Sequence, residues 1–442
     1  MLSREDNEKL TQTGPGTPGG GLMRAYWQPA ALVAELDEAR PVKPVRLLGE
    51  DLVLFRKGDG SYGLIGRWCA HRGVDLAYGR LEECGMRCLY HGWLYDAEGR
   101  CVEQPAEPAH SRFHTKIRHV SYPVQERNGI VFAYLGGGDP PPFPDYDCFV
   151  APDAYTFAFK GLWECNWLQG VEGGIDPSHV SFLHRFLDED PRETYGQQFA
   201  ELVEGTDKTL SALVGENFRP DIEVETTDYG LRVFAVRDLG QQIHHVRITN
   251  LMFPNAFVVP FGNTKVFAQW HVPIDDHSHY WYMILYDFAE QTDKETLWNQ
   301  RISEVTLPDF RPVRNRSNAW GFDVAEQQTL TYTGMGLDIN VHDQWAVESM
   351  GPIQDRTVER LGVSDRAVTA NRRLLLRAIE DHEAGLPTPG RPTDDASARS
   401  FTGPLAFDTI ARAEAWQEGW RAGEARRREQ SPWAGSGARA GV

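Results

Sequence analysis

Two short stretches, Cys69-Ala-His71-Arg-Gly73 and Cys88-Leu-Tyr-His91-Gly-Trp93, decide the fold of the first third of this chain. In each stretch a histidine follows a cysteine after two or three positions, and sixteen residues separate His71 from Cys88. This spacing suits two loops that close on one metal cluster from opposite sides. Cysteine thiolates can hold one iron of a [2Fe–2S] cluster while imidazoles hold the other. The sequence therefore predicts a two-iron, one-electron centre at Cys69, His71, Cys88 and His91.

Structural zinc is the alternative, because zinc also binds two cysteines and two histidines. A zinc finger usually groups its cysteines before its histidines, whereas cysteine and histidine alternate here. Gly73 and Gly92 closely follow the two histidines. A glycine at such a place lets the backbone approach a cluster or turn with positive φ. These observations favour a Rieske-type [2Fe–2S] cluster over zinc.

The composition is that of a large folded protein with an acidic surface. The chain has 442 residues and a mass of 49.9 kDa, enough for two or three domains. Its formal net charge of −18 argues against nucleic acid or an anionic membrane as a partner. No apolar run approaches the roughly 20 residues that span a bilayer, and the N-terminus lacks an apolar signal core. The six cysteines show no disulfide spacing, so we expect a cytoplasmic protein.

Turn residues mark the domain boundaries in the first part of the chain. Glycine and proline dominate residues 11–22, which predicts an irregular N-terminal arm over 1–23. Short strand-like segments fill a first domain over 24–140, including a hairpin at 51–65. The Gly/Pro-rich run 136–144 indicates a linker to the next domain.

The remainder of the chain mixes strands and helices. Strand patterns occupy roughly 209–285, and an N-cap signal at Ser364-Asp365 precedes a helix that runs to about Glu383. Strands followed by long helices predict an α+β domain over 141–390, with helices on one face of an antiparallel sheet. A C-terminal tail over 391–442 contains one expected helix between Ala406 and Arg428.

Asp176, His179 and His184 form a second candidate metal site. Two histidines and a carboxylate leave open positions on one face of Fe(II), where O₂ and a substrate can bind. The histidines are five residues apart, about 140° around an ideal helix, so they do not share a helical face. They can reach one ion only where the helix bulges or is interrupted between them. The third ligand must come from downstream, and chemistry alone leaves four candidates: Asp338, Asp343, Glu348 and Asp355.

Four further motifs occur along the chain. They are Gly14-Pro-Gly-Thr-Pro18, Arg24-Ala-Tyr-Trp27, Gly170-Val-Glu-Gly-Gly-Ile-Asp-Pro-Ser-His179 and Glu348-Ser-Met-Gly-Pro-Ile-Gln-Asp-Arg356. With them, residues 1–385 resemble the α subunits of the Rieske non-haem iron aromatic ring-hydroxylating oxygenases. The resemblance is strongest to the α-only branch that includes phthalate dioxygenase and the oxygenase of 5,5′-dehydrodivanillate O-demethylase. It implies an all-β Rieske domain and a helix-grip, START-like catalytic domain.

The resemblance also implies roles for single residues. His179 and His184 would bind a mononuclear Fe(II), and Asp343 would be the third ligand. Asp176 would not be a ligand but a hydrogen-bonding bridge to His91 of the partner subunit. One departure is Glu172, which stands where several ring-hydroxylating relatives have an asparagine near the iron. Their substrate pocket therefore cannot be transferred to this chain.

The function implied by the resemblance is that of a terminal oxygenase. An NAD(P)H-dependent reductase or a ferredoxin would supply the electrons. O₂ would oxidise an aromatic acid, by O-demethylation of a methoxylated lignin-derived aromatic or by ring dihydroxylation of a phthalate-like acid. The bridge between subunits implies a homotrimer or stacked trimers. Arg247 is a candidate partner for the substrate carboxylate, or else a surface or ion-paired arginine.

Two alternative functions lack the oxidation step. In one, the chain is a non-catalytic Rieske electron-transfer protein, which predicts no iron beyond the two cluster atoms. In the other, it is a ligand-binding protein with an inactive second site. The intact pair His179 and His184 argues against both.

Overall fold

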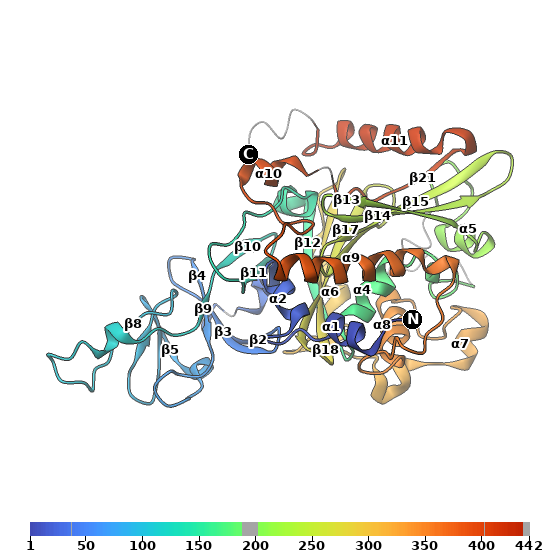
Figure 1. The fold of residues 1–442 in the computed structure, drawn as a ribbon. Coiled ribbons are helices and arrows are strands. Elements are labelled where there is room, and N and C mark those ends of the chain that lie inside the picture. Colours follow the sequence, from blue (N-terminus) through green and yellow to red (C-terminus); the bar gives the residue numbers. More distant parts are fainter. Residues whose placement is uncertain (37, 188–201, 402, 436–442) are drawn as a thin grey trace.

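The first third of the chain folds into an all-β lobe, here called the β lobe. The computed structural model describes residues 1–36, 38–187, 202–401 and 403–435. The described strands of the β lobe form three small antiparallel sheets. The first contains β1 (Trp27–Leu32), β11 (Ile130–Tyr134) and β10 (Val124–Arg127), and the second contains β2 (Val42–Leu47), β3 (Glu50–Arg56), β4 (Tyr62–Gly66) and β9 (Ser121–Tyr122). The third contains β5 (Arg80–Glu82), β6 (Gly85–Arg87), β7 (Leu94–Tyr95) and β8 (Cys101–Glu103). The β lobe projects from one end of a larger lobe (Figure 1).

Two strand predictions in the β lobe are confirmed, and a third strand is shorter than predicted. β3 and β4 form the expected hairpin, with Leu52 opposite Gly66, and Gly60 has φ of +84° in the turn. β11 is the expected closing strand and pairs with β1. The strand expected over 89–95 is limited to β7, because the residues before it form a cysteine- and histidine-bearing loop.

A large antiparallel sheet organises the second lobe. Its strands run in the order β12 (Thr156–Trp163), β18 (Ser278–Asp287), β17 (Lys265–Asp275), β16 (Ala256–Pro260), β15 (Ile243–Met252), β14 (Gly230–Asp238) and β13 (Asp221–Thr227), and β21 (Phe407–Arg412) also pairs with β15. A short pair, β19 (Val305–Thr306) with β20 (Arg311–Pro312), lies outside this sheet. The sheet and its packed helices confirm the predicted α+β class.

Helices cover both faces of the large sheet, so the expectation of helices on one face alone is wrong. α4 (Trp167–Ile175) and α9 (Arg366–Glu383) pack against one face. α11 (Trp416–Gln430) lies on the other face, where Trp420 packs against Phe234 and Val246 (Figure 1). The predicted N-cap Asp365 precedes α9. The other helices are α1 (Arg4–Thr11), α2 (Pro18–Arg24), α3 (Asp147–Val150), α5 (Leu210–Glu216), α6 (Lys294–Ile302), α7 (Val324–Thr329), α8 (Ile339–Ser349) and α10 (Asp395–Ser400).

Two regions predicted without helices are helical. α1 and α2 occupy much of the arm predicted to be irregular, and the side chains of Ser3 and Thr17 cap them. Position 20 of α2 requires glycine, because a Cβ there would lie 2.4 Å from the carbonyl oxygen of Gly14. α5 likewise replaces the start of the strand region predicted over 209–285.

The predicted C-terminal tail contributes to the large sheet. Residues expected at the start of its helix instead form β21, in which Ile410 lies opposite His245 of β15. α11 then follows as the predicted helix. The domain boundaries predicted after residues 23, 140 and 390 stay predictions. Within the described part of the chain, no helix combines the length and the apolar character needed to cross a membrane.

Candidate metal centres

Two loops with the same backbone geometry carry the four predicted cluster ligands. In each loop the cysteine N–H, of Cys69 or Cys88, donates to the carbonyl oxygen five residues later, at 2.8 Å. The glycine four residues after each cysteine donates back to the cysteine carbonyl, at 2.8 Å and 3.0 Å respectively. These glycines, Gly73 and Gly92, have φ of +72° and +74°, which L side chains rarely adopt. They therefore fold each Cys–His pair into the same tight turn.

The four side chains on these loops lie together. Cys69 and Cys88 are buried, and burial together with the contact to Cys69 raises the pKa of the Cys88 thiol. The rings of His71 and His91 lie nearer to solvent, with their centroids 4.6 Å apart. Trp93 stacks on His71 at 4.5 Å. Two buried thiols next to each other and two adjoining imidazoles form the donor set that a mixed-ligand [2Fe–2S] cluster needs.

His179, His184 and Asp343 meet beyond the end of α4. The α-helix stops at Ile175, and His179 opens a short 3₁₀ turn that ends before His184. This interruption, which the spacing required, brings both rings to one point. Their Nε2 atoms lie 3.8 Å and 3.3 Å from Oδ1 of Asp343, and one ligand atom from each residue falls within 4.8 Å of the others. Ligands at about 2.1 Å from one ion and at right angles lie roughly 3 Å apart, so the set fits a single ion held on one face.

The orientation of His179 suits a metal ligand. Its Nδ1 lies 2.6 Å from the backbone carbonyl oxygen of Asp176, which can only accept, so Nδ1 carries the proton. Burial lowers the pKa of His179, so the neutral ring keeps a bare Nε2. This lone pair faces the carboxylate of Asp343. The nitrogen lone pair and the carboxylate oxygen repel each other unless a cation lies between them. The donor set therefore fits a divalent metal.

Of the four acidic candidates for the third ligand, only Asp343 reaches the histidines in the described part of the chain. Asp338 pairs with a buried arginine and caps α8. Glu348 accepts hydrogen bonds from a backbone N–H and an indole, and Asp355 accepts from Thr357 within its own turn. Burial acts to raise the pKa of Asp343, but the nearby imidazoles hold it below its usual value.

Asp176 ends α4 and lies next to His179. Its Oδ1 accepts from the Ser178 N–H at 2.8 Å, and its Oδ2 is 3.8 Å from Nδ1 of His179. Its side chain keeps 24% of its surface exposed. The carboxylate is therefore accessible next to one of the histidines, as a bridge between subunits requires.

Known proteins identify the family. A family model described as "Rieske [2Fe-2S] domain" matches residues 26–122, and one described as "LigXa C-terminal domain like" matches residues 133–435. The phthalate 4,5-dioxygenase oxygenase subunit of Pseudomonas putida is 35% identical over 404 residues, which cover 87% of this chain and 88% of that protein. The chain belongs to the Rieske aromatic ring-hydroxylating oxygenases. It is the terminal oxygenase component of such a system.

Two further comparisons agree with this family. The 5,5′-dehydrodivanillate O-demethylase oxygenase subunit of Sphingobium sp. is 31% identical over 392 residues, covering 87% of this chain and 82% of that protein. The solved reduced complex between oxygenase and ferredoxin in carbazole 1,9a-dioxygenase has the same fold, with a TM-score of 0.54, 23% identity, and coverage of 87% of this chain and 98% of that chain. The cofactors of this oxygenase are a Rieske [2Fe–2S] cluster and a mononuclear iron.

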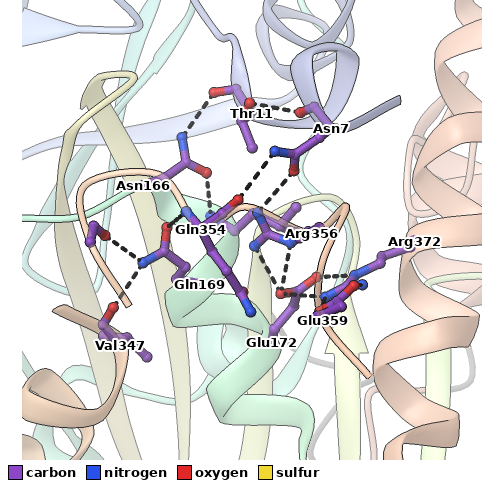
Figure 2. A network of polar contacts seen from close by, with 12 residues as sticks. Asn7, Thr11, Asn166, Gln169, Glu172, Val347, Gln354, Arg356, Glu359 and Arg372 are labelled. Carbon is purple, nitrogen blue, oxygen red and sulfur yellow. Dashed lines mark hydrogen bonds and ion pairs between the residues drawn. The ribbon is translucent and has the colours of Figure 1, made fainter. Parts of the chain in front are cut away.

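A buried amide joins α4 to α8 in the oxygenase. Gln169 of α4 donates through Nε2 to the carbonyl oxygens of Val347 at 2.8 Å and Gly351 at 3.0 Å (Figure 2). Its Oε1 accepts from the N–H of Gln354 at 2.9 Å. These bonds fix the C-terminal end of α8 against α4. They therefore set the position of Asp343 relative to the two histidines that follow α4.

Glu172 belongs to the same buried network. Its carboxylate accepts from Arg356 and Arg372, and Arg372 also pairs with Glu359 (Figure 2). Burial opposes ionisation of Glu172, but the two guanidinium groups hold its pKa below the usual value. In this oxygenase Glu172 therefore forms a structural ion pair between α4 and α9.

Replacing Glu172 with alanine should lower the free energy of unfolding by about 3–5 kcal/mol, because two buried guanidinium groups lose their shared carboxylate. Glu164→Ala is the matched control, since Glu164 forms an exposed pair with Arg311 and should contribute less than about 1 kcal/mol. Denaturant unfolding followed by near-UV circular dichroism measures both. Equal losses in the two variants would contradict the structural role of Glu172.

Sequence reasoning missed Gln169 and also His342. The Nδ1 atom of His342 lies 3.4 Å from Nδ1 of His184. Neither residue has a spacing signal, because their contacts depend on how distant helices pack. For Arg247 the ion-paired alternative holds, although the residue is buried. Its guanidinium pairs with Asp408 of β21 and donates to the carbonyl oxygen of Pro260 at 2.9 Å.

Proposed function

We propose that this oxygenase oxidises an aromatic acid at a mononuclear iron held by His179, His184 and Asp343. The observation that carries the proposal is that Asp343, far along the chain from His179 and His184, brings its carboxylate to them, so that one ligand atom of each residue lies within 4.8 Å of the others. We further propose that electrons arrive through a Rieske cluster held by four residues: Cys69, His71, Cys88 and His91. Their two matching loops and the 4.6 Å separation of the imidazoles support this assignment.

The side chains prepare the site for its metal. Bound iron would supply open coordination positions and the redox chemistry that O₂ activation needs. The carbonyl group of Asp176 orients the ring of His179. Asp343 offsets positive charge, and its side chain keeps 29% of its surface exposed. Two imidazoles and one carboxylate on one face leave the other face for substrate.

The names of similar proteins support an aromatic acid as the substrate. Proteins 31–35% identical to this chain include oxygenase subunits named for phthalate, 3-chlorobenzoate and phenoxybenzoate. The relative named for 5,5′-dehydrodivanillate O-demethylation supports oxidation of a methoxy group on a lignin-derived aromatic. The relative named for phthalate supports ring dihydroxylation of a phthalate-like acid. We propose one of these two reactions.

We also propose a head-to-tail ring, most simply a homotrimer or stacked trimers, in which Asp176 bridges to His91 of the partner subunit. Within one chain the cluster loops belong to the β lobe, which projects away from α4 and α8 (Figure 1). Large exposed side chains occur at both places: Tyr90 in a cluster loop is 53% exposed, and Phe182 between the two iron-site histidines is 44% exposed. Exposed aromatic side chains at both sites support docking of one subunit on the next.

The electron donor in this proposal is an NAD(P)H-dependent reductase or a ferredoxin. Solved structures of the same fold include oxygenase–ferredoxin complexes of carbazole 1,9a-dioxygenase. The exposed ring of His71 gives a donor access to the cluster. We place the protein in the cytoplasm, which its six unpaired cysteines support.

Iron content and O₂ uptake test the proposed function. Anaerobically purified protein should contain about three iron atoms per chain, whereas about two would favour the non-catalytic electron-transfer alternative. With a reductase and NAD(P)H, a panel of aromatic acids should include one that stimulates O₂ uptake. Formaldehyde release then identifies O-demethylation, and a dihydrodiol product identifies ring dihydroxylation. Failure of every aromatic acid would overturn the assigned substrate class.

Tyr95→Phe should lower the reduction potential of the Rieske cluster. The Tyr95 hydroxyl is fully buried and lies 3.3 Å from Sγ of Cys69, to which it donates when the sulfur is a cluster ligand. Such a bond stabilises the more negative, reduced cluster. A hydrogen bond worth about 0.5–1.5 kcal/mol corresponds to roughly 20–60 mV for one electron. A spectroelectrochemical titration measures the shift, with Tyr62→Phe in the distant hairpin as the control. A potential equal to that of the wild type would contradict the role of Tyr95.

A further inference from the structure

We infer that His342 is a positioning residue that holds His184 in the tautomer and orientation needed to bind the mononuclear iron. The inference deepens the proposed function and rests on it. His342 lies outside both ligand motifs of the sequence. It is buried in α8, directly before Asp343. Adjacent helical residues point about 100° apart. His342 and Asp343 can therefore serve the same site from two directions.

A chain of three groups defines the proton positions. Nε2 of His342 lies 2.8 Å from the carbonyl oxygen of Gly336, which can only accept, so this nitrogen carries a proton. The buried ring of His342 faces a carbonyl oxygen through Nε2 and another imidazole through Nδ1, and a neutral imidazole carries one proton. Its Nδ1 is therefore a bare acceptor.

The acceptor faces His184. The two Nδ1 atoms are 3.4 Å apart, so the proton between them belongs to His184. Nε2 of His184 is then unprotonated and lies 3.3 Å from Oδ1 of Asp343, where the proposed iron would bind. Gly336 has φ of +83°, a conformation suited to glycine, and its N–H donates to Glu326 at 2.6 Å. The loop before α8 is therefore anchored, and it fixes the last acceptor of the chain.

The two histidines of the iron site are thus oriented by different groups. His179 donates to a backbone carbonyl oxygen, whereas His184 donates to a side chain that mutation can remove. Loss of a partner behind a metal-bound histidine typically weakens metal binding by about 10–100-fold. Substitution of His342 should therefore change the affinity of the site for iron while all three ligand residues stay in place.

Three substitutions of His342 test whether its hydrogen-bond acceptor or only its packing holds His184 in place. His342→Asn places an oxygen where Nδ1 of His342 lies and keeps an acceptor for His184. His342→Gln keeps a group near Gly336 but removes that acceptor. His342→Leu has the branched shape of asparagine and offers neither contact. The measurement is the rate at which Fe(II) passes from the mononuclear site to an excess of a coloured chelator, with the Rieske absorbance as the check on folding.

We expect iron release to be about 10–100-fold faster in the Leu and Gln variants, and the Asn variant to stay within a few-fold of the wild type. If the Leu variant fails to fold, the comparison of Gln with Asn decides. Equal release rates in the Gln and Asn variants, or wild-type rates in all variants, would overturn the role of His342. A wild-type protein with only about two iron atoms per chain would instead contradict the proposed function, and this inference with it.

Discussion

Replacing Asp343 with alanine should leave a folded oxygenase with an intact Rieske spectrum, little mononuclear iron, and turnover reduced more than about 100-fold. Asp343 supplies the carboxylate among three ligand atoms that lie within 4.8 Å of one another. Its loss leaves two neutral imidazoles, which bind Fe(II) weakly. Iron analysis after removal of excess metal and O₂ uptake with reductase measure both effects.

Asp355→Ala is the matched control for this experiment. Asp355 was an equal candidate by chemistry, but it is exposed and accepts hydrogen bonds only within its own turn. Iron content and turnover of this variant should equal those of the wild type. Full iron content in Asp343→Ala would contradict the ligand role of Asp343.

Asp176→Asn should retain both iron sites and the assembled ring, yet slow electron transfer from the cluster about tenfold or more. The asparagine oxygen can still accept from the Ser178 N–H, and the backbone carbonyl group that orients His179 is unchanged. The change replaces a charged acceptor, worth about 1.5–3 kcal/mol, by a neutral one worth about 0.5–1.5 kcal/mol. The proposed hydrogen bond to His91 of the partner subunit should weaken accordingly.

A single turnover of pre-reduced protein with substrate and O₂ measures this effect through the reoxidation of the cluster. Asp238→Asn is the control, because the Asp238 carboxylate makes a similar turn contact, with the N–H of Gly240 at 2.8 Å. Its reoxidation rate should equal that of the wild type. An unchanged rate in Asp176→Asn would refute the bridging role while leaving the metal assignments intact.

The elements predicted correctly from sequence depend on local chemistry. The hairpin of β3 and β4 follows from a glycine turn between apolar runs, and α9 begins directly after the predicted Ser364-Asp365 signal, although the Asp365 side chain makes no capping bond to it. The two cluster loops follow from Cys–His pairs with nearby glycines. Each of these signals lies within a few residues of the structure that it predicts, so no knowledge of the packing is needed.

The elements that sequence reasoning missed depend on distant contacts. Gly20 is required within α2 because the loop that follows α1 packs too closely against it for a side chain. Asp338, Asp343 and Glu348 are alike in chemistry, and the packing of α8 on α4 through Gln169 decides which of them meets His184. β21 joins a strand 159 to 169 residues earlier in the chain, counted from Ile248 opposite Phe407 to Ile243 opposite Arg412, and no local pattern reports such a pairing.

The late position of β21 imposes an order on biosynthesis. The β lobe has all its strands once residue 134 is made, whereas the large sheet needs residues 407–412. At roughly 5–20 residues per second, translation of the interval takes about 14–56 s. During that time a nascent chain can present a finished cluster-binding lobe beside an unfinished iron-binding one. The four cluster ligands are therefore all synthesised before Asp343, the last ligand of the proposed iron site, and well before the last strand of the large sheet.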